Sequence, residues 1–192
     1  MRKSKVIMGV MAMAMVAALT ACGTKATTET KTETTTANAA NSSEITGDGV
    51  ATKGQLVMVT NLEFPPFEYR ENDQPTGIDV DIAKEVAKKM GLELKVDDIA
   101  FDSIIPELVS GKADISFAGM TVTEDRKQSV DFTQTYAKAS QMIIVKNDSS
   151  IAGPDDLKNK RIGVQQGTTG DLFSSTVEGA TIERYNKGME AV

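Results

Sequence analysis

The side chains that could carry chemistry in this chain of 192 residues are carboxylates, hydroxyls and guanidinium groups, because it contains no histidine and a single cysteine, Cys22. A zinc site built on His or Cys, a haem held by His, a Ser-His-Asp triad and a Cys-His dyad all need residues that are missing. The formal net charge of −6 argues against nucleic acid, whose phosphates bind a basic surface. A carboxylate- or hydroxyl-based enzyme and a binding protein remain.

Arg126 follows Thr121 by five residues and lies in a short helical turn that we expect over residues 123–127. A guanidinium group never loses its charge and offers two parallel donors that match a carboxylate. The N-terminus of a helical turn also favours an anion. Taken alone, the pattern fits equally well a surface arginine paired with Glu124 or Asp125.

A Gly-Thr-Thr-Gly turn at 167–170 follows a predicted strand at 161–165 and precedes a helix that we expect from about residue 171. Hydroxyl and amide groups at the start of a helix are donors for an anion. The turn is not a phosphate-binding loop, because no lysine follows its last glycine. An ordinary helix cap explains one of the two threonines equally well.

Strands and helices alternate along the sequence from residue 55, which predicts a mostly parallel α/β sheet. The predicted strands cover residues 56–60, 92–96, 114–118, 140–145, 161–165 and 181–185. A helix from Gly77 would bury the stripe Ile78, Ile82, Val86 and Met90 and end at Gly91. A second helix, capped by Asp102 or Ser103, would end at Gly111, and residues 61–75 are predicted as a loop. Ligands of such sheets bind at the carboxyl ends of the strands, so the loops after residues 60, 99, 118 and 164 are the candidate binding loops.

The N-terminus has the pattern of a secretory signal. Basic residues at positions 2, 3 and 5 precede an uncharged run at 6–19, which as a helix would be about 21 Å long, short of a bilayer core of about 30 Å. The sequence Leu19-Thr20-Ala21-Cys22 resembles the bacterial lipobox, which implies acylation of Cys22 and cleavage just before it. A buried helix of the fold and a chance free thiol are the alternatives. We expect an extracytoplasmic protein anchored by lipid to the cell membrane.

Four segments, in order from about residue 55 to the last residue, carry a resemblance to a known family. They are EFPPFEY at 63–69, GIDVD at 77–81, the run from FDSIIP at 101 to TVTEDR ending at 126, and GVQQGTTG at 163–170. Together they resemble the polar amino acid family of extracytoplasmic solute-binding proteins, family 3, the receptors of ABC importers. The resemblance implies a periplasmic-binding-protein-like bilobal α/β fold, in which each lobe is a mostly parallel sheet flanked by helices.

This resemblance sets the expected domain organisation. A lipoprotein signal peptide would cover residues 1–21. The acylated cysteine and a disordered, Thr-rich linker would cover residues 22–53. Lobe 1 of the solute-binding domain would cover 54–137, the hinge and crossover strand 138–147, and the start of lobe 2 148–192. Because a helix has barely begun at residue 188, we expect that lobe 2 is incomplete and that the protein is truncated at its C-terminus.

The resemblance also implies a ligand site for a free amino acid. Phe64 and Phe101 match the aromatic walls that enclose the ligand, while Phe67 and Phe117 fit the core better. The other implied ligand-binding residues are Ala118, Gly119, Thr121, Arg126, Gln165, Thr168 and Thr169. Arg126 matches the arginine that binds the ligand's carboxylate. Asn61 departs from relatives that take basic or amide side chains, which often have Asp there, so the ligand's side chain stays open.

The function implied is a membrane-anchored receptor that delivers an amino acid to the permease subunits of an ABC importer. It would work as a monomer without cofactor, metal or catalytic residue, and without binding nucleic acid. The alternatives are the sensing domain of a chemoreceptor or sensor kinase, a dehydratase on the same fold, and an adhesive or structural lipoprotein. A dehydratase would need a general acid with a shifted pKa in the cleft, and no acid near 61–69 or 118–126 stands out in the sequence.

Overall fold

The computed structural model describes residues 49–192, which belong to one compact unit. The predicted signal peptide, the lipidation site Cys22 and almost all of the predicted linker lie outside the described residues. Among residues 49–192, none of the helices has the length and apolar character needed to cross a bilayer.

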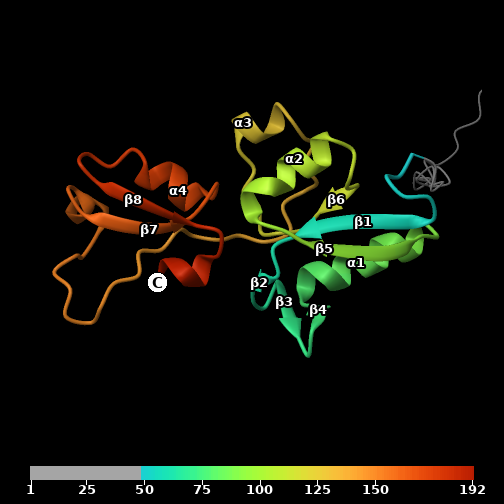
Figure 1. Cartoon of the computed structure of the whole chain (residues 1–192), viewed down its shortest axis with the longest axis horizontal. Coiled ribbons are helices and arrows are strands. Elements are labelled where there is room, and N and C mark those ends of the chain that lie inside the picture. The colour runs from blue at the N-terminus through green and yellow to red at the C-terminus, as the bar shows by residue number, and fades with distance from the viewer. Residues whose placement is uncertain (1–48) are drawn as a thin grey trace, which may run out of the picture. The chain divides into compact units, whose positions relative to one another are not determined.

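A three-stranded parallel sheet in the order β5-β1-β6 forms the first part of the fold, as the alternation of strands and helices predicted. Its strands are β1 (Gln55–Thr60), β5 (Glu93–Asp98) and β6 (Ile115–Ser116). Figure 1 shows helix α1 (Ile78–Lys89) running along β1 and β5. A 3-10 turn, η1 (Phe101–Ser103), leads directly into helix α2 (Ile104–Val109), which contacts β1 and β6.

Strand β1 is buried on both faces, which explains why it reads as an unbroken apolar run. Val57 and Val59 point to one face, where they pack with Ile104 of α2. Met58 points to the other face and packs with Ala83 of α1 and with Phe117. The carboxyl end of this central strand therefore leads into the loop at Asn61, beside the loop that follows β6.

The buried face of α1 is rotated by about a quarter of a turn from the predicted stripe, although Ile82 of that stripe does pack on the core. Val80, Ala83 and Ala87 are the buried apolar residues of this helix, whereas Ile78 is 46% exposed. Small alanine side chains let the helix approach the sheet closely, and the larger Ile and Val residues border that contact. Gly91, with φ +67°, follows the C-cap Met90, as predicted for the helix end.

Residues 61–75 do not form the predicted loop alone, because three short antiparallel strands lie within 63–76. They are β2 (Glu63–Phe64), β3 (Glu68–Glu71) and β4 (Gln74–Thr76), in the order β2-β3-β4. A tight turn at Asn72 and Asp73, both with positive φ, joins β3 to β4. Gly77 lies between β4 and α1, where the backbone passes close to Phe67. Its φ is +121°, and a Cβ there would collide with the carbonyl oxygen of Phe67. Two-residue strands are too short to show a periodic pattern.

A second, two-stranded parallel sheet pairs β7 (Arg161–Gln165) with β8 (Thr181–Tyr185), both at the predicted positions. Between them lies helix α4 (Thr169–Ser174), which begins two residues earlier than predicted because Thr168 caps it. The short turns α3 (Glu124–Lys127), η2 (Pro154–Leu157) and η3 (Gly188–Ala191) complete the described elements.

The strand predicted at 140–145 is absent from the structure. None of the backbone hydrogen bonds formed within residues 49–192 involves residues 138–145, and Met142 and Ile144 are 73% and 71% exposed. A strand is stable only when a neighbour accepts and donates its backbone hydrogen bonds. The β-branched run supplies the propensity but finds no neighbouring strand in the described part of the protein.

Candidate functional site

Arg126 is half-buried and does not pair with its acidic neighbours. Its Nη1 donates to the carbonyl oxygen of Thr121 at 2.6 Å and its Nη2 to that of Gly167 at 2.9 Å. The surface alternative fails because Glu124 pairs with Lys127 instead, at 2.9 Å. Burial lowers the pKa of the Arg126 guanidinium from its ordinary value, but so basic a group stays charged at neutral pH.

The turn that carries Arg126 is built by its own sequence. Thr123 is the N-cap of α3, and its Oγ1 accepts the backbone N–H of Arg126 at 3.2 Å. The guanidinium carbon lies over the ring of Phe101, 5.6 Å from its centroid. Phe101 also packs on the core cluster of Val57 and Ile104, so the ring is fixed from behind. A planar cation held between an aromatic face and two carbonyl oxygens is positioned for a carboxylate.

The loop after β6 places the next predicted residues. Ala118 is buried, whereas Gly119 and Thr121 are exposed. Gly119 has φ +55°, and a Cβ there would lie 3.3 Å from the Phe64 ring. Phe64 therefore lies against this loop, stacked on Phe67 with ring centroids 5.6 Å apart, and is 49% exposed. The structure thus brings Phe64 to the Gly119 loop and Phe101 to Arg126.

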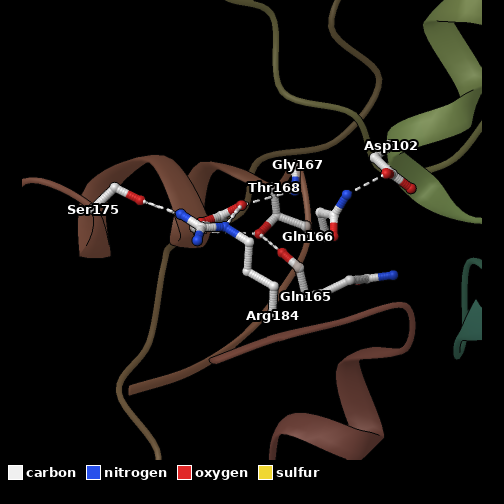
Figure 2. Close-up of polar contacts among 8 residues, drawn as sticks. Asp102, Gln165, Gln166, Gly167, Thr168, Ser175 and Arg184 are labelled. Atoms are coloured by element: carbon white, nitrogen blue, oxygen red, sulfur yellow. Dashed lines mark hydrogen bonds and ion pairs between the residues drawn. The ribbon is translucent and has the colours of Figure 1, made fainter. Parts of the chain in front are cut away.

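The turn between β7 and α4 holds the remaining predicted residues, of which Figure 2 shows Gln165 and Thr168. The hydroxyl of Thr168 accepts the backbone N–H of Asp171 at 3.2 Å and donates to the carbonyl oxygen of Gln165 at 2.8 Å. This is the ordinary helix cap that the sequence left open as an alternative for one threonine. The hydroxyl of Thr169 lies 3.5 Å from the side-chain oxygen of Gln141, a weak contact, and is half-buried.

Besides the bond from Arg126 to Gly167, two polar contacts link this turn to the first sheet's loops. The side-chain amide of Gln165 donates to the Asn61 oxygen at 2.9 Å. The amide of Gln166 donates to the Asp102 carboxylate at 2.6 Å, as Figure 2 shows. Gly167 lies so close to Asp102 that a Cβ at 167 would be 2.9 Å from the Asp102 Cβ. The side chain of Gln165 is therefore already engaged by Asn61.

Asp171 was missed by the sequence analysis, although it organises the turn. Its carboxylate is buried and accepts the backbone N–H of Gly167 at 3.0 Å. Arg184 of β8 donates from Nε to both carboxylate oxygens, at 2.9 and 3.1 Å, and from Nη2 to Ser175 (Figure 2). Burial raises the pKa of Asp171, but the Gly167 N–H and Arg184 outweigh it and hold the pKa below its usual value. The sequence signal was an acidic residue three positions after a threonine cap.

Glu63 is a second group whose role the sequence did not resolve. Its Oε1 forms an ion pair with Lys187, which raises the pKa of the lysine. Its Oε2 is buried and has no hydrogen-bond partner among residues 49–192. Over the same range, no three acidic or sulfur ligands cluster closely enough to hold a metal ion.

Comparison with known proteins decides the family. A family model described as bacterial extracellular solute-binding proteins, family 3, matches residues 56–191. The chain belongs to this family. Its periplasmic-binding-protein-like α/β fold agrees with the solved structures that resemble it, which confirms the resemblance and the fold class predicted from the sequence.

Several curated relatives of the chain are named as arginine-binding. The arginine-binding extracellular protein ArtP of Bacillus subtilis is 46% identical over 116 residues, 60% of this chain and 46% of the relative. The L-arginine-binding protein of Pseudomonas aeruginosa is 38% identical over 133 residues, 67% of this chain and 51% of the relative. The chain spans about half the length of the curated relatives it matches.

Solved structures of amino acid-binding proteins also resemble the chain. The arginine-bound form of truncated ArgBP from T. maritima is 41% identical, with a TM-score of 0.71 over 75% of this chain and 69% of the other. The ancestral amino acid-binding protein AncCDT-1, a precursor of cyclohexadienyl dehydratase, is 37% identical, with a TM-score of 0.64 over 72% of this chain and 63% of the other. The boundaries predicted for the lobes and the hinge stay predictions.

Proposed function

We propose that the protein is an extracytoplasmic receptor that binds a free amino acid with a cationic side chain and delivers it to an ABC importer. The observation that carries the amino acid ligand is Arg126, whose half-buried guanidinium is held on the Phe101 ring and away from Glu124 and Asp125. Two of its five N–H groups are used by carbonyl oxygens, which leaves donors for the ligand's carboxylate.

The α-ammonium of the ligand would bind at the loop after β6. Gly119 is exposed and has no Cβ, so a ligand can reach the backbone carbonyl oxygens there without obstruction. Thr121 is an exposed residue of the same loop, and the ring of Phe64 packs against this loop at Gly119. The zwitterion is then enclosed from two sides. One side is formed by Ala118, Gly119 and Thr121 with Phe64, and the other by Phe101 with Arg126.

Glu63 supports a cationic side chain on the ligand. One oxygen of this carboxylate is buried and has no partner within residues 49–192, and a buried acceptor gains most from a charged donor. Asn61, the position that is often Asp in relatives, is neutral and engaged by Gln165. The negative charge for a guanidinium or imidazolium would therefore come from Glu63, which would share it with Lys187 on its other oxygen. The arginine- and histidine-binding names of the relatives agree with this choice.

Membrane attachment and delivery complete the proposal. The Leu19-Thr20-Ala21-Cys22 sequence supports a lipid anchor at Cys22. An ABC transporter arginine-binding protein of Escherichia coli, 41% identical over 122 residues, supports delivery to an importer. The protein would act without cofactor and, as we expect, as a monomer.

One observation favours the dehydratase alternative, which needs a general acid with a shifted pKa. Burial and Asp79 raise the pKa of Glu68 to about 9. A general acid must lie within hydrogen-bond reach of the bond it protonates. Glu68 is 1% exposed, and its residue faces Asp79 rather than an open surface. We therefore assign Glu68 to the protein's internal structure and not to catalysis.

The decisive experiment is isothermal titration of the full-length protein with arginine, histidine, glutamine and glutamate. The proposal expects micromolar or tighter binding of arginine or histidine and weaker binding of the other two. Preference for glutamate would contradict the assignment of Glu63, and binding of none of the four would contradict an amino acid receptor of this specificity.

A further inference from the structure

Two carboxyl groups are buried together beneath the proposed ligand loop. Glu68 begins β3 and is 1% exposed, and Asp79 lies in the first turn of α1 and is fully buried. The backbone N–H of Asp79 donates to the carbonyl oxygen of Phe67 at 2.9 Å, which fixes the start of the helix beside β3. The ligand site described above uses neither carboxyl group.

One proton explains the hydrogen bonding of this pair. Glu68 Oε2 and Asp79 Oδ1 are both buried without a partner within residues 49–192, if both groups are ionised acceptors. A proton on Glu68 would turn its carboxyl group into a donor to the neighbouring Asp79 carboxylate. Burial, the charge of Asp79 and a hydrogen bond to it raise the pKa of Glu68 to about 9, so the group is neutral at pH 7.

The pair connects to the ligand loop through Tyr136. The Tyr136 hydroxyl donates to Asp79 Oδ2 at 3.0 Å and accepts the backbone N–H of Gly119 at 3.3 Å. Its ring packs edge-on against Phe117, with centroids 5.8 Å apart. On the other side of the same loop, the Thr60 hydroxyl donates to the Phe117 carbonyl oxygen at 2.6 Å.

We propose that Glu68, Asp79 and Tyr136 are positioning residues for the amino acid site, because their hydrogen-bonded series orients the Gly119 peptide that receives the ligand's ammonium. This inference rests on the proposed function and adds residues that do not touch the ligand. Each donor in the series has one acceptor: Tyr136 donates to Asp79, Gly119 donates to Tyr136, and protonated Glu68 would donate to Asp79. The Gly119 N–H is thereby turned away from the ligand, which leaves carbonyl oxygens to face the ammonium.

The first test removes only the central hydroxyl. Tyr136→Phe keeps the ring on Phe117 but releases Gly119, and we expect the Kd for arginine to rise at least fivefold while circular dichroism stays unchanged. Tyr69→Phe is the matched control, because no hydrogen bond formed by the described residues uses the Tyr69 hydroxyl, and its Kd should change less than twofold. Equal Kd values for Tyr136→Phe and the wild type would overturn the proposal.

The second test uses pH, which a merely structural role would not link to affinity. Glu68→Gln replaces the neutral carboxyl by an amide that can donate to Asp79 at every pH. The titratable groups that face Glu68 are Asp79 on α1 and Tyr136, whose pKa is raised by burial and by Asp79. On the flanking strands, β4 has no titratable residue, and Glu63 of β2 lies opposite Tyr69 and pairs with Lys187.

We expect the ratio of the wild-type Kd to the Glu68→Gln Kd to stay constant up to about pH 8 and to rise at least threefold by pH 10. The ratio cancels the titration of the ligand's own ammonium, which affects both proteins equally. A ratio that stays flat to pH 10 would overturn the proposal, even if Tyr136→Phe fails to fold.

Arg126→Ala separates this inference from the proposed function. If Arg126→Ala leaves arginine binding unchanged, the proposed site itself is wrong and the positioning residues fall with it. If Arg126→Ala abolishes binding but Tyr136→Phe and the pH ratio show no effect, the site stands and the positioning role is wrong.

Discussion

The hydrogen-bond partners of Arg126 predict how substitutions of this residue affect ligand binding. Its donors meet carbonyl oxygens, whereas its charge has no carboxylate partner among residues 49–192. Arg126→Ala should weaken arginine binding by about 3 kcal/mol or more, because it leaves the ligand's carboxylate desolvated without its cation. Arg126→Lys should recover only part of this, since an ammonium cannot reproduce the planar double donor. Isothermal titration measures both.

Arg161→Ala is the matched control for that prediction. Arg161 is exposed and pairs with Glu183 across β7 and β8, so its loss should leave the ligand affinity within twofold of wild type. An equal loss of affinity in both arginine variants would indicate a general effect of charge rather than a carboxylate site.

Substitution of Glu63 should weaken the binding of some ligands more than that of others. Glu63→Gln keeps the shape of the side chain and removes its charge, so arginine should lose about 1.5 kcal/mol of binding free energy, the range of a hydrogen bond to a charged group. Glutamine, which has no charge on its side chain, should lose less than half of this. Titration of both ligands against both proteins checks the difference, and an equal loss for the two would remove Glu63 from specificity.

The surroundings of Arg126 could be anticipated from the chemistry of its side chain, whereas the ligand-binding role of the site residues stays a prediction. A guanidinium group beside a threonine and a helical turn suggested a carboxylate ligand, and the structure shows that Arg126 indeed avoids its acidic neighbours. The series from Glu68 to Tyr136 was not predictable from the sequence. Tyr136 lies 57 positions after Asp79 and 68 after Glu68, so these residues become neighbours only when the chain folds. Carboxyl groups become partners only when burial removes the water between them.

At the scale of elements, packing decided what periodicity could not. The strands β1, β7 and β8 were predicted correctly because both the apolar run and a parallel partner are present. The run at 140–145 also contains β-branched residues but has no neighbouring strand within residues 49–192, and it stays irregular. In α1 the buried positions are set by the close approach of Ala83 and Ala87 to the sheet, a preference for small residues that a hydrophobic stripe does not reveal.

The turn between β7 and α4 gives a prediction for this scale. Asp171 holds the Gly167 N–H and Arg184 of β8 at once, so Asp171→Asn should lower the free energy of unfolding by about 1–3 kcal/mol at pH 7. The pKa of Asp171 is lower in the folded protein than in the unfolded state, so its stabilisation is present above the unfolded value of about 3.8 and is lost as pH falls through the folded value.

Urea unfolding at pH 7 and at pH 3 tests the turn. The difference between the wild type and Asp171→Asn should shrink as the pH falls, because protonation of Asp171 makes the two proteins alike. Asp155→Asn is the control, since Asp155 is an exposed residue of η2 and should change the unfolding free energy by less than about 0.5 kcal/mol. A difference that is the same at both pH values would mean that the carboxylate charge is not what holds the turn.

At the scale of the whole molecule, the proposed receptor depends on being held where its importer is. A single acyl group gives only marginal membrane binding, whereas two or three hold a protein stably. Cys22→Ala removes the thiol that would carry the lipid, so the variant should move from the membrane fraction to the soluble or secreted fraction. Its affinity for arginine should stay within twofold of wild type, because the sites at Arg126 and Gly119 lie more than ninety residues further along the sequence.

Thr20→Ala serves as the control for the anchor, because it changes the same segment and keeps the cysteine. Fractionation followed by immunoblotting measures where each variant lies, and mass spectrometry of the N-terminal peptide measures the lipid directly. Retention of Cys22→Ala in the membrane fraction would contradict the anchor. Lost arginine affinity in a released Cys22→Ala protein would instead link the N-terminus to the binding domain, because a lipid on a linker should act only by holding the receptor at the membrane surface.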